Sequence, residues 1–189
     1  MKLHHLLAST PDQDPILAGR LDGKRMFARA IEEVPPQKVS FVVVMDFGNV
    51  DLATSSFMSE AVLPLREHLR ARRPPVFLVV ANLNEKVREE LEELLSRLGE
   101  ALLACEYTPG MEPKRIELLG TLKPELLETW DLVRSKGETT AVELHSGTES
   151  DGIGPTAWNN RLAALASKSL VVEVPQGRSK KYRSILESA

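Results

Sequence analysis

The chain of 189 residues has a single cysteine and no long apolar run, and each shortage excludes a class of protein or site. Cys105 alone forms neither a disulfide within the chain nor a thiolate metal cluster. No apolar run approaches the roughly 20 residues that a membrane span needs, and residues 1–9 are too short and too polar for a secretory signal. We therefore expect a cytoplasmic protein without a membrane segment.

Catalytic signatures are missing as well. The histidines stand in unrelated contexts, and no Gly-rich phosphate loop, His-Glu-x-x-His pair or Cys/His framework occurs. Asp46 and Asp51 flank a loop and could bind a cation, but an aspartate at the end of a strand is more often a turn former. We predict that the protein is not an enzyme and that it holds no cofactor or metal.

The charge is unevenly distributed along the chain. The net charge of −3 argues against a uniformly basic surface for nucleic acid. From Pro155 to the end, however, six basic residues oppose two glutamates, so this part carries +4 and residues 1–154 carry −7. An acidic body with a basic C-terminal part predicts that any phosphate contacts are made at that end.

Residues 1–113 alternate between strand and helix patterns, which is typical of a small α/β sheet domain. The predicted helices cover residues 23–33, 56–70 and 83–98, and the predicted strands cover residues 39–46, 76–81 and 101–107. The strands are continuous apolar runs, which favour a sheet with helices packed on each side. Asn82, with Glu85 three residues later, is predicted to cap the third helix. The segment 108–113 is rich in proline and glycine and is predicted to be the domain boundary.

Residues 114–189 are predicted to form an α+β domain of helices followed by a β-hairpin. A helix over residues 122–136 is stopped by Gly137, and Thr140 with Glu143 forms a capping box for a short helix over residues 140–146. Pro155 begins a third helix, because proline at the first helical position loses only an N–H that has no partner there. Strands over residues 170–174 and 179–185 flank a turn at residues 175–178. We assign Trp130 and Trp158 to the core.

The segment IGPTAWNNRLAAL, residues 153–165, with the Leu-Val strand and basic hairpin after it, resembles bacterial winged helix–turn–helix regulators over roughly residues 118–186. This resemblance implies a third helix that faces the major groove of DNA or its phosphate walls, and hairpin cations that contact phosphates. The segment 147–154 exceeds the usual turn of about three to four residues, and Ser169 stands where such domains usually place a glycine. The DNA-binding residues that the resemblance implies are Thr156, Asn159, Asn160, Arg161, Arg178, Lys180, Lys181 and Arg183.

Three stretches of the first half, GRLDGKR (residues 19–25), VVVMDFGNVDLATSSFMSE (42–60) and VVANLNEKVREELEELL (79–95), resemble the STAS-like domains of bacteria, relatives of the anti-sigma factor antagonists. By position, Ser55 falls where those antagonists carry their phosphorylated serine, although Thr54 replaces the usual acid and Phe57 the usual glycine. A phosphate or other anion on Ser55 or Ser56 would lie at a helix N-terminus, where it is stabilised. We favour the simpler interpretation, in which Thr54 and Ser55 cap the helix.

Together the two resemblances imply a two-domain bacterial or archaeal transcriptional regulator. Its STAS-like domain would receive a signal or bind a regulatory protein, and its winged helix would bind double-stranded DNA. We expect a homodimer, because a single small DNA-binding domain has limited affinity and specificity for its DNA site. The alternative is a signalling adaptor with no DNA target, in which the first domain engages an ATPase-type anti-sigma kinase and the winged helix contacts protein. Salt-dependent binding to duplex DNA distinguishes the two.

Overall fold

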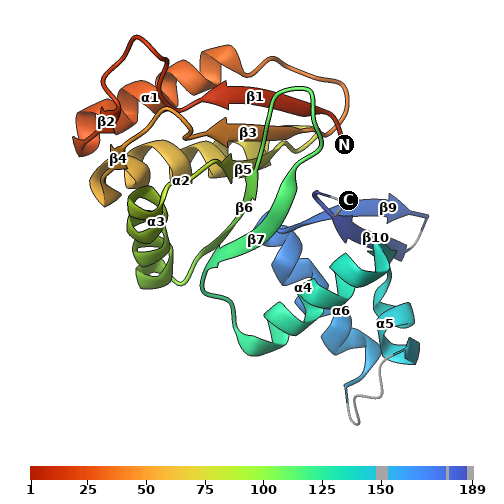
Figure 1. The fold of residues 1–189 in the computed structure, drawn as a ribbon. Helices are drawn as coiled ribbons and strands as arrows, with labels where there is room; N and C mark the ends of the chain where they lie inside the picture. The colour runs from red at the N-terminus through yellow and green to blue at the C-terminus, as the bar shows by residue number, and fades with distance from the viewer. Residues whose placement is uncertain (148–152, 178, 187–189) are drawn as a thin grey trace. The chain divides into compact units, whose positions relative to one another are not determined.

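The computed structural model describes residues 1–147, 153–177 and 179–186, and the chain divides into two compact units. The first unit comprises Met1–Thr121, and the second begins at Leu122 (Figure 1). Both units contain helices and strands, so the chain has the mixed α/β fold that the sequence predicts at this coarse level.

The first unit is built from short apolar strands that alternate with helices. The strands are β1 (Leu3–Leu7), β2 (Ile16–Leu17), β3 (Val42–Asp46), β4 (Leu52–Ala53), β5 (Phe77–Ala81), β6 (Ala101–Glu106) and β7 (Lys114–Gly120). The helices are α1 (Gly19–Glu33), α2 (Ser55–Ala71) and α3 (Glu85–Leu98). The main sheet has the order β1-β3-β5-β6-β7, with β1, β3, β5 and β6 parallel and β7 antiparallel to β6. β2 and β4 form a separate parallel pair.

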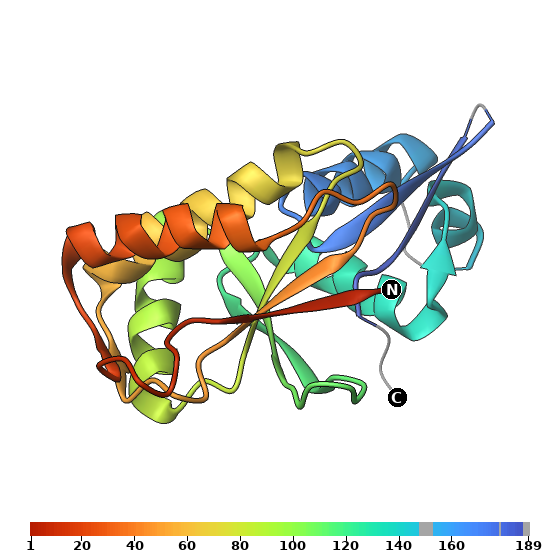
Figure 2. The ribbon, with the colours of Figure 1, turned by 90° about the horizontal axis from the view of Figure 1, so that it is seen from above.

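All three helices of the first unit pack on one face of the main sheet. The register aligns Leu6, Met45, Val80 and Ala104 across four strands, and these side chains join the buried faces of α1, α2 and α3 in one core. Figure 2 shows α1 and α2 side by side over the strands. The prediction of helices on each side of the sheet is therefore wrong for this unit. An apolar run indicates burial on both faces, but it does not say which element covers the second one.

The predicted boundary at residue 113 moves to residue 121. The segment 108–113 is the loop of a hairpin, in which the Met111 N–H donates to Thr108 O at 2.9 Å and Gly110 has φ +85°. β7, which follows this loop, pairs with β6 and is the fifth strand of the sheet. Proline and glycine are frequent both in tight turns and in linkers, so composition alone did not separate the two.

Over its described residues, the second unit combines three helices with an antiparallel sheet of three strands. The helices are α4 (Pro124–Lys136), α5 (Ala141–Gly147) and α6 (Pro155–Ser167), and the strands are β8 (Glu138–Thr139), β9 (Val171–Gln176) and β10 (Ser179–Ser184). The sheet order is β8-β10-β9. Among the helices that the structure describes, none is both long and apolar enough to cross a membrane.

The core and the caps of the second unit follow the sequence pattern closely. Trp130 and Trp158 are both buried, as predicted, and Trp158 is fully enclosed. The predicted capping box is confirmed: the Thr140 N–H donates to Glu143 Oε2 at 2.7 Å, and the Glu143 N–H donates to Thr140 Oγ1 at 3.1 Å. The hydrogen bond from the Thr140 N–H lowers the pKa of the Glu143 carboxyl. Local pairs of this kind depend only on neighbouring residues, so a single sequence can reveal them.

Replacing Ser169 by glycine is expected to raise the free energy of unfolding of the second unit by about 1 kcal/mol. Ser169 has φ +58°, a left-handed conformation that costs little only for glycine, and it is 3% exposed. Its hydroxyl hydrogen-bonds to none of the described residues. Urea unfolding followed by tryptophan fluorescence measures this unit alone, because Trp130 and Trp158 both belong to it.

The matched control for this variant is Ser167→Gly at the end of α6, where glycine meets ordinary helical backbone. That control should lower the unfolding midpoint, since glycine in a helix costs roughly 0.5–1 kcal/mol. A lower midpoint for Ser169→Gly as well would contradict the account of this position.

Candidate functional site

One edge of α6 carries three of the residues that the sequence predicts to bind DNA. Thr156, Asn159 and Asn160 are all exposed, and their spacing of three and four places them on one side of the helix. The opposite side is buried through Trp158 and Leu162, so the helix cannot rotate this polar edge inward without exposing its core face. The structure therefore brings these three side chains together on an accessible surface.

Arg161, in contrast, packs into its own unit. Its guanidinium lies over the Trp158 ring, 4.9 Å from the centroid, and its Nη1 is 3.5 Å from Glu128 Oε2 on α4. The side chain is only 18% exposed. Sequence reasoning grouped Arg161 with the polar edge, but a residue three positions after Trp158 also lies beside that ring. Arg161 therefore does not share the exposed edge of the helix.

Two of the cations of the β9–β10 hairpin are matched by carboxylates. Lys180 Nζ lies 2.9 Å from Glu173 Oε1 on β9, and Lys181 Nζ lies 2.8 Å from Glu138 Oε1 on β8. These hydrogen bonds raise the pKa of both lysines. Arg183 has a buried Nε without a hydrogen-bond partner among the described residues, and Arg178 lies outside the described residues.

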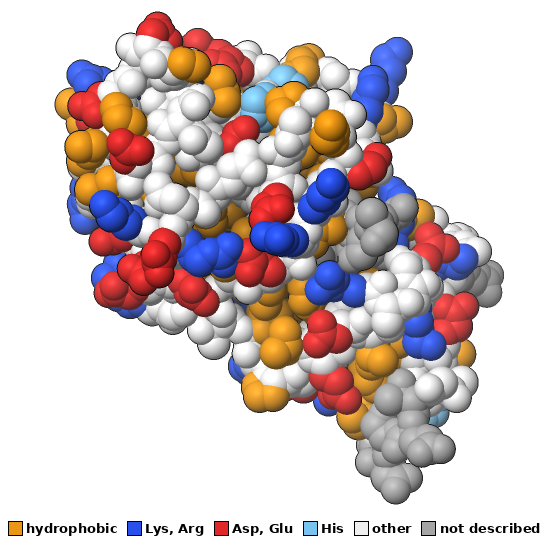
Figure 3. Space-filling view, in the orientation of Figure 1, with side chains coloured by type: hydrophobic (Ala, Val, Ile, Leu, Met, Phe, Trp, Pro, Cys, Tyr) orange, Lys and Arg blue, Asp and Glu red, His pale blue; other side chains and the backbone are white. Residues whose placement is uncertain are grey.

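The balance of +4 therefore overstates the positive charge that the hairpin presents. That balance was counted from Pro155 onward, so it does not include Glu138. No sequence spacing indicates that Glu138 pairs with Lys181. Figure 3 shows basic and acidic side chains interspersed on the face in view. Exposed ion pairs contribute only about 0–1 kcal/mol, so a phosphate can replace either glutamate at little cost.

At the start of α2, Thr54 has the predicted capping role, whereas Ser55 does not cap the helix and binds Glu90 of α3. Thr54 is the N-cap, and its Oγ1 accepts the Phe57 N–H at 3.3 Å. The N–H and the hydroxyl of Ser55 both donate to Glu90 Oε2 of α3, at 3.1 and 3.0 Å, and the Ser56 hydroxyl contacts Thr54 Oγ1 at 3.1 Å. An anion at Ser55 would have to displace the Glu90 carboxylate. No local pattern could reveal Glu90, since it lies 35 positions away along the chain.

A polar cluster lies at the carboxyl ends of β3, β5 and β6. Asp46, 7% exposed, accepts three hydrogen bonds: from the Gly48 N–H at 2.9 Å, from Asn82 Nδ2 at 2.8 Å and from His5 Nε2 at 2.8 Å. The bond to Gly48 confirms that Asp46 forms the turn. Among the described residues, no group of three or more metal-ligating side chains could hold an ion.

Asn82 belongs to this cluster and does not cap α3. Its amide donates to Asp46 and to Tyr107 O at 2.8 Å, while its Oδ1 accepts the Tyr107 N–H at 2.9 Å. The N-cap is Asn84, whose Oδ1 accepts the Val87 N–H at 3.0 Å. The prediction named Asn82 alone, and no local pattern shows that Asn82 adopts φ +57° and binds Asp46 of β3 and Tyr107, which follows β6.

Cys105 is expected to react with thiol reagents at pH 8 at least about a hundredfold more slowly in the folded protein than in urea. Burial, and then the nearby Asp46 charge, raise the pKa of the thiol from 9.0 to about 12. Little thiolate therefore exists at pH 8, and the thiolate is the reactive form. The release of thionitrobenzoate from Ellman's reagent measures the rate, with glutathione in both solutions as the control. Equal rates would contradict the buried position.

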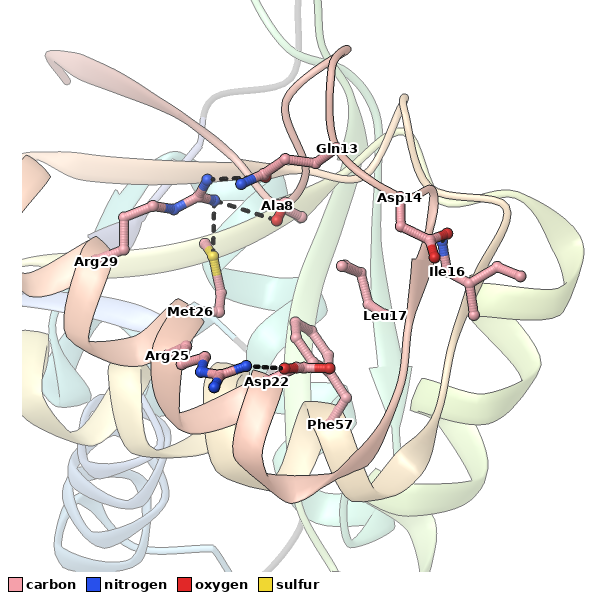
Figure 4. A pocket seen from close by; sticks show the side chains of 10 residues that line it. All are labelled: Ala8, Gln13, Asp14, Ile16, Leu17, Asp22, Arg25, Met26, Arg29 and Phe57. Atoms are coloured by element: carbon pink, nitrogen blue, oxygen red, sulfur yellow. Dashed lines mark hydrogen bonds and ion pairs between the residues drawn. The ribbon is translucent and has the colours of Figure 1, made fainter.

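A pocket of about 310 Å³ lies between α1, the segment around β2, and Phe57 of α2 (Figure 4). Met26, Leu17 and Phe57 form its apolar wall. Arg29 extends along its upper rim, where its Nη2 donates to Ala8 O at 3.2 Å, and Arg25 pairs with Asp22 at 3.0 Å on the lower side. The volume is at the lower end of the range for small-molecule sites, roughly 300–1,000 Å³. The first unit therefore contains a small apolar pocket with charged residues at its rims, and neither sequence resemblance indicated this pocket.

Comparison of the sequence with protein families and curated proteins identified no relative. No protein-family model matches the chain, and no curated protein is similar to it. Its function must therefore be argued from the residues described above.

Proposed function

We propose that the protein is a DNA-binding transcriptional regulator. The unit that begins at Leu122 would be a winged helix–turn–helix domain, and Met1–Thr121 would be a STAS-like domain that receives a signal or binds a regulatory protein. The order helix, strand, helix, helix and hairpin supports the first assignment, together with the sheet order β8-β10-β9.

The observation that carries the proposal is the polar edge of α6. Thr156, Asn159 and Asn160 are short or amide side chains, exposed together at the N-terminal part of the third helix of the unit. In helix–turn–helix proteins this part of the recognition helix contacts base edges. An asparagine amide can accept and donate at once, which matches the N6 and N7 atoms of adenine in the major groove. The hairpin lysines, once released from their glutamates, would contact phosphates.

The input function would belong to the first unit. A sheet with its helices on one face, and a helix that starts at Thr54-Ser55-Ser56 after a buried strand, supports the STAS-like assignment. The pocket beside Phe57 is the place where a small ligand could act on both α1 and α2. We assign the input to a small molecule at this pocket or to a protein partner, and not to Ser55, whose hydroxyl is already bound by Glu90.

One observation favours the second function, an adaptor without a DNA target. The ion pairs Lys180–Glu173 and Lys181–Glu138 leave a hairpin of mixed charge, which suits a protein partner as well as a phosphate backbone. The polar edge of α6 distinguishes the two, since a protein contact would favour apolar side chains at that place.

Binding of the full chain to random-sequence duplex DNA tests the proposal. Fluorescence anisotropy at salt concentrations from about 50 to about 300 mM gives the binding constant, and its logarithm should fall linearly with the logarithm of the salt concentration. Selection from a random pool should then enrich sites with paired, inverted half-sites about 10 base pairs apart. Absence of any binding at the lowest salt would support the adaptor instead.

A further inference from the structure

The outer edge of β1 is an open sheet edge in the first unit. β1 and β7 are the two edge strands, and β1 pairs only with β3 among the described strands. The Val42 N–H donates to Lys2 O at 3.0 Å, and the Ala8 N–H donates to Asp46 O at 2.8 Å. The even-numbered residues of this stretch therefore direct their backbone N–H and C=O groups toward β3. Because alternate residues of a parallel strand direct their backbone groups to opposite sides, Leu3, His5 and Leu7 direct theirs outward.

The two edges of the sheet differ in how they are protected. β7 carries Lys114, Arg115 and Glu117, and its pairing with β6 is interrupted by a bulge. Charged side chains and bulges are the usual devices that stop an edge from pairing with another strand. β1 reads Leu-His-His-Leu-Leu, with neither proline nor bulge and with no Lys, Arg, Asp or Glu, and burial lowers the pKa of His4. The β1 edge is therefore suited to pair.

We propose that two copies of the chain associate by antiparallel pairing of their β1 strands, with the two-fold axis at His5. The outward residues are symmetric about that point, since Leu3 then meets Leu7 of the second copy and His5 meets His5. Each of these pairs has outward N–H and C=O groups on both strands, so each can exchange two backbone hydrogen bonds. Leu7 O already accepts Arg29 Nη2, and a carbonyl has a second lone pair for the new bond.

This symmetry is the reason to assign the edge to a second copy and not to another extended peptide. The residues whose backbone groups point outward read leucine, histidine, leucine in either direction. A two-fold axis at the histidine therefore places one Leu3–Leu7 pair on each side of the axis. The pairing joins the two sheets into one. It does not depend on the proposed function, although a two-fold dimer is also what paired DNA half-sites require.

A charge-pair experiment on the full chain, without DNA, tests both the dimer and its register. Sedimentation over a concentration series up to about 100 µM should give the wild-type chain a mass twice the 21.0 kDa of one copy. Leu3→Glu alone and Leu7→Lys alone should each raise the dissociation constant about tenfold or more, because each places a charge against a leucine of the second copy. The double variant Leu3→Glu/Leu7→Lys should restore dimerisation, since each introduced carboxylate then faces an introduced ammonium across the axis.

The design controls for folding and for surface charge. Leu3 and Leu7 are partly exposed, and far-UV circular dichroism checks that each variant keeps its secondary structure. Val39→Glu changes an exposed apolar residue outside the strand, 59% exposed, and should leave the mass unchanged. A monomeric wild-type chain, single variants that dimerise as the wild type does, or a double variant without rescue would each overturn the proposal. DNA binding is measured separately, so its failure is distinguishable from failure of this dimer.

Discussion

Replacing Lys180 and Lys181 by alanine should reduce the slope of log binding constant against log salt concentration by about 2 for duplex DNA. Each lysine that neutralises a phosphate releases about one counterion, so each loss removes about one unit of slope. The variant also leaves Glu173 and Glu138 without their cations, which adds repulsion from the phosphates. Fluorescence anisotropy over the same salt series measures both effects.

The glutamates provide the opposite test of the same surface. Glu138→Gln and Glu173→Gln release the two lysines and should strengthen DNA binding, whereas an adaptor surface would gain no affinity for DNA. The matched control for the Lys180→Ala/Lys181→Ala variant is Lys24→Ala/Lys86→Ala, which removes the same two positive charges from exposed positions on α1 and α3. An equal loss of slope in this control would show that net charge, and not the hairpin, determines binding.

Replacing Asp46 by alanine is expected to lower the free energy of unfolding of the first unit by about 3 kcal/mol. The variant leaves the Gly48 N–H, the Asn82 amide and His5 Nε2 without their shared acceptor in a buried place. Asn82 holds its left-handed conformation through these bonds, so the connection between β3, β5 and β6 should loosen as well. Exposure of Cys105 to Ellman's reagent during urea unfolding reports on this unit.

Two comparisons show whether the effect is specific to Asp46. Asp51→Ala removes an exposed carboxylate from the same loop and should change the unfolding free energy by less than about 0.5 kcal/mol. The tryptophan fluorescence transition should stay in place, because Trp130 and Trp158 lie in the second unit. An Asp46→Ala midpoint within error of the wild type would contradict the role of the cluster.

Features set by neighbouring residues were predictable from the sequence. The helix that begins at Gly154-Pro155 and the capping box of Thr140 and Glu143 depend on residues within one turn, and both are present. The left-handed backbone at Ser169 also fits its position, where a glycine would be usual. The exposed edge of α6 followed from helical spacing alone, since Trp158 and Leu162 fix which side faces inward.

Features set by distant residues were not predictable. Glu90 reaches Ser55 from another helix, and Glu138 reaches Lys181 from another strand, so no spacing rule connects them. The predicted cap Asn82 is instead bound by Asp46 and Tyr107, which are far away along the chain. The hairpin loop at residues 108–113 has the composition of a linker, and only the pairing of β7 with β6 identifies it.

The most direct test of the central claim is a nitrogen-15 spectrum of the full chain during titration with a selected duplex DNA. The account predicts that the side-chain amides of Asn159 and Asn160 shift together with the backbone amides of Thr156, Lys180 and Lys181. The side-chain amide of Asn84, which is bonded to Val50 O in the first unit, should stay unchanged. Shifts confined to Met1–Thr121, or a spectrum that DNA leaves unaltered, would contradict the assignment of α6 and its hairpin as the DNA-binding surface.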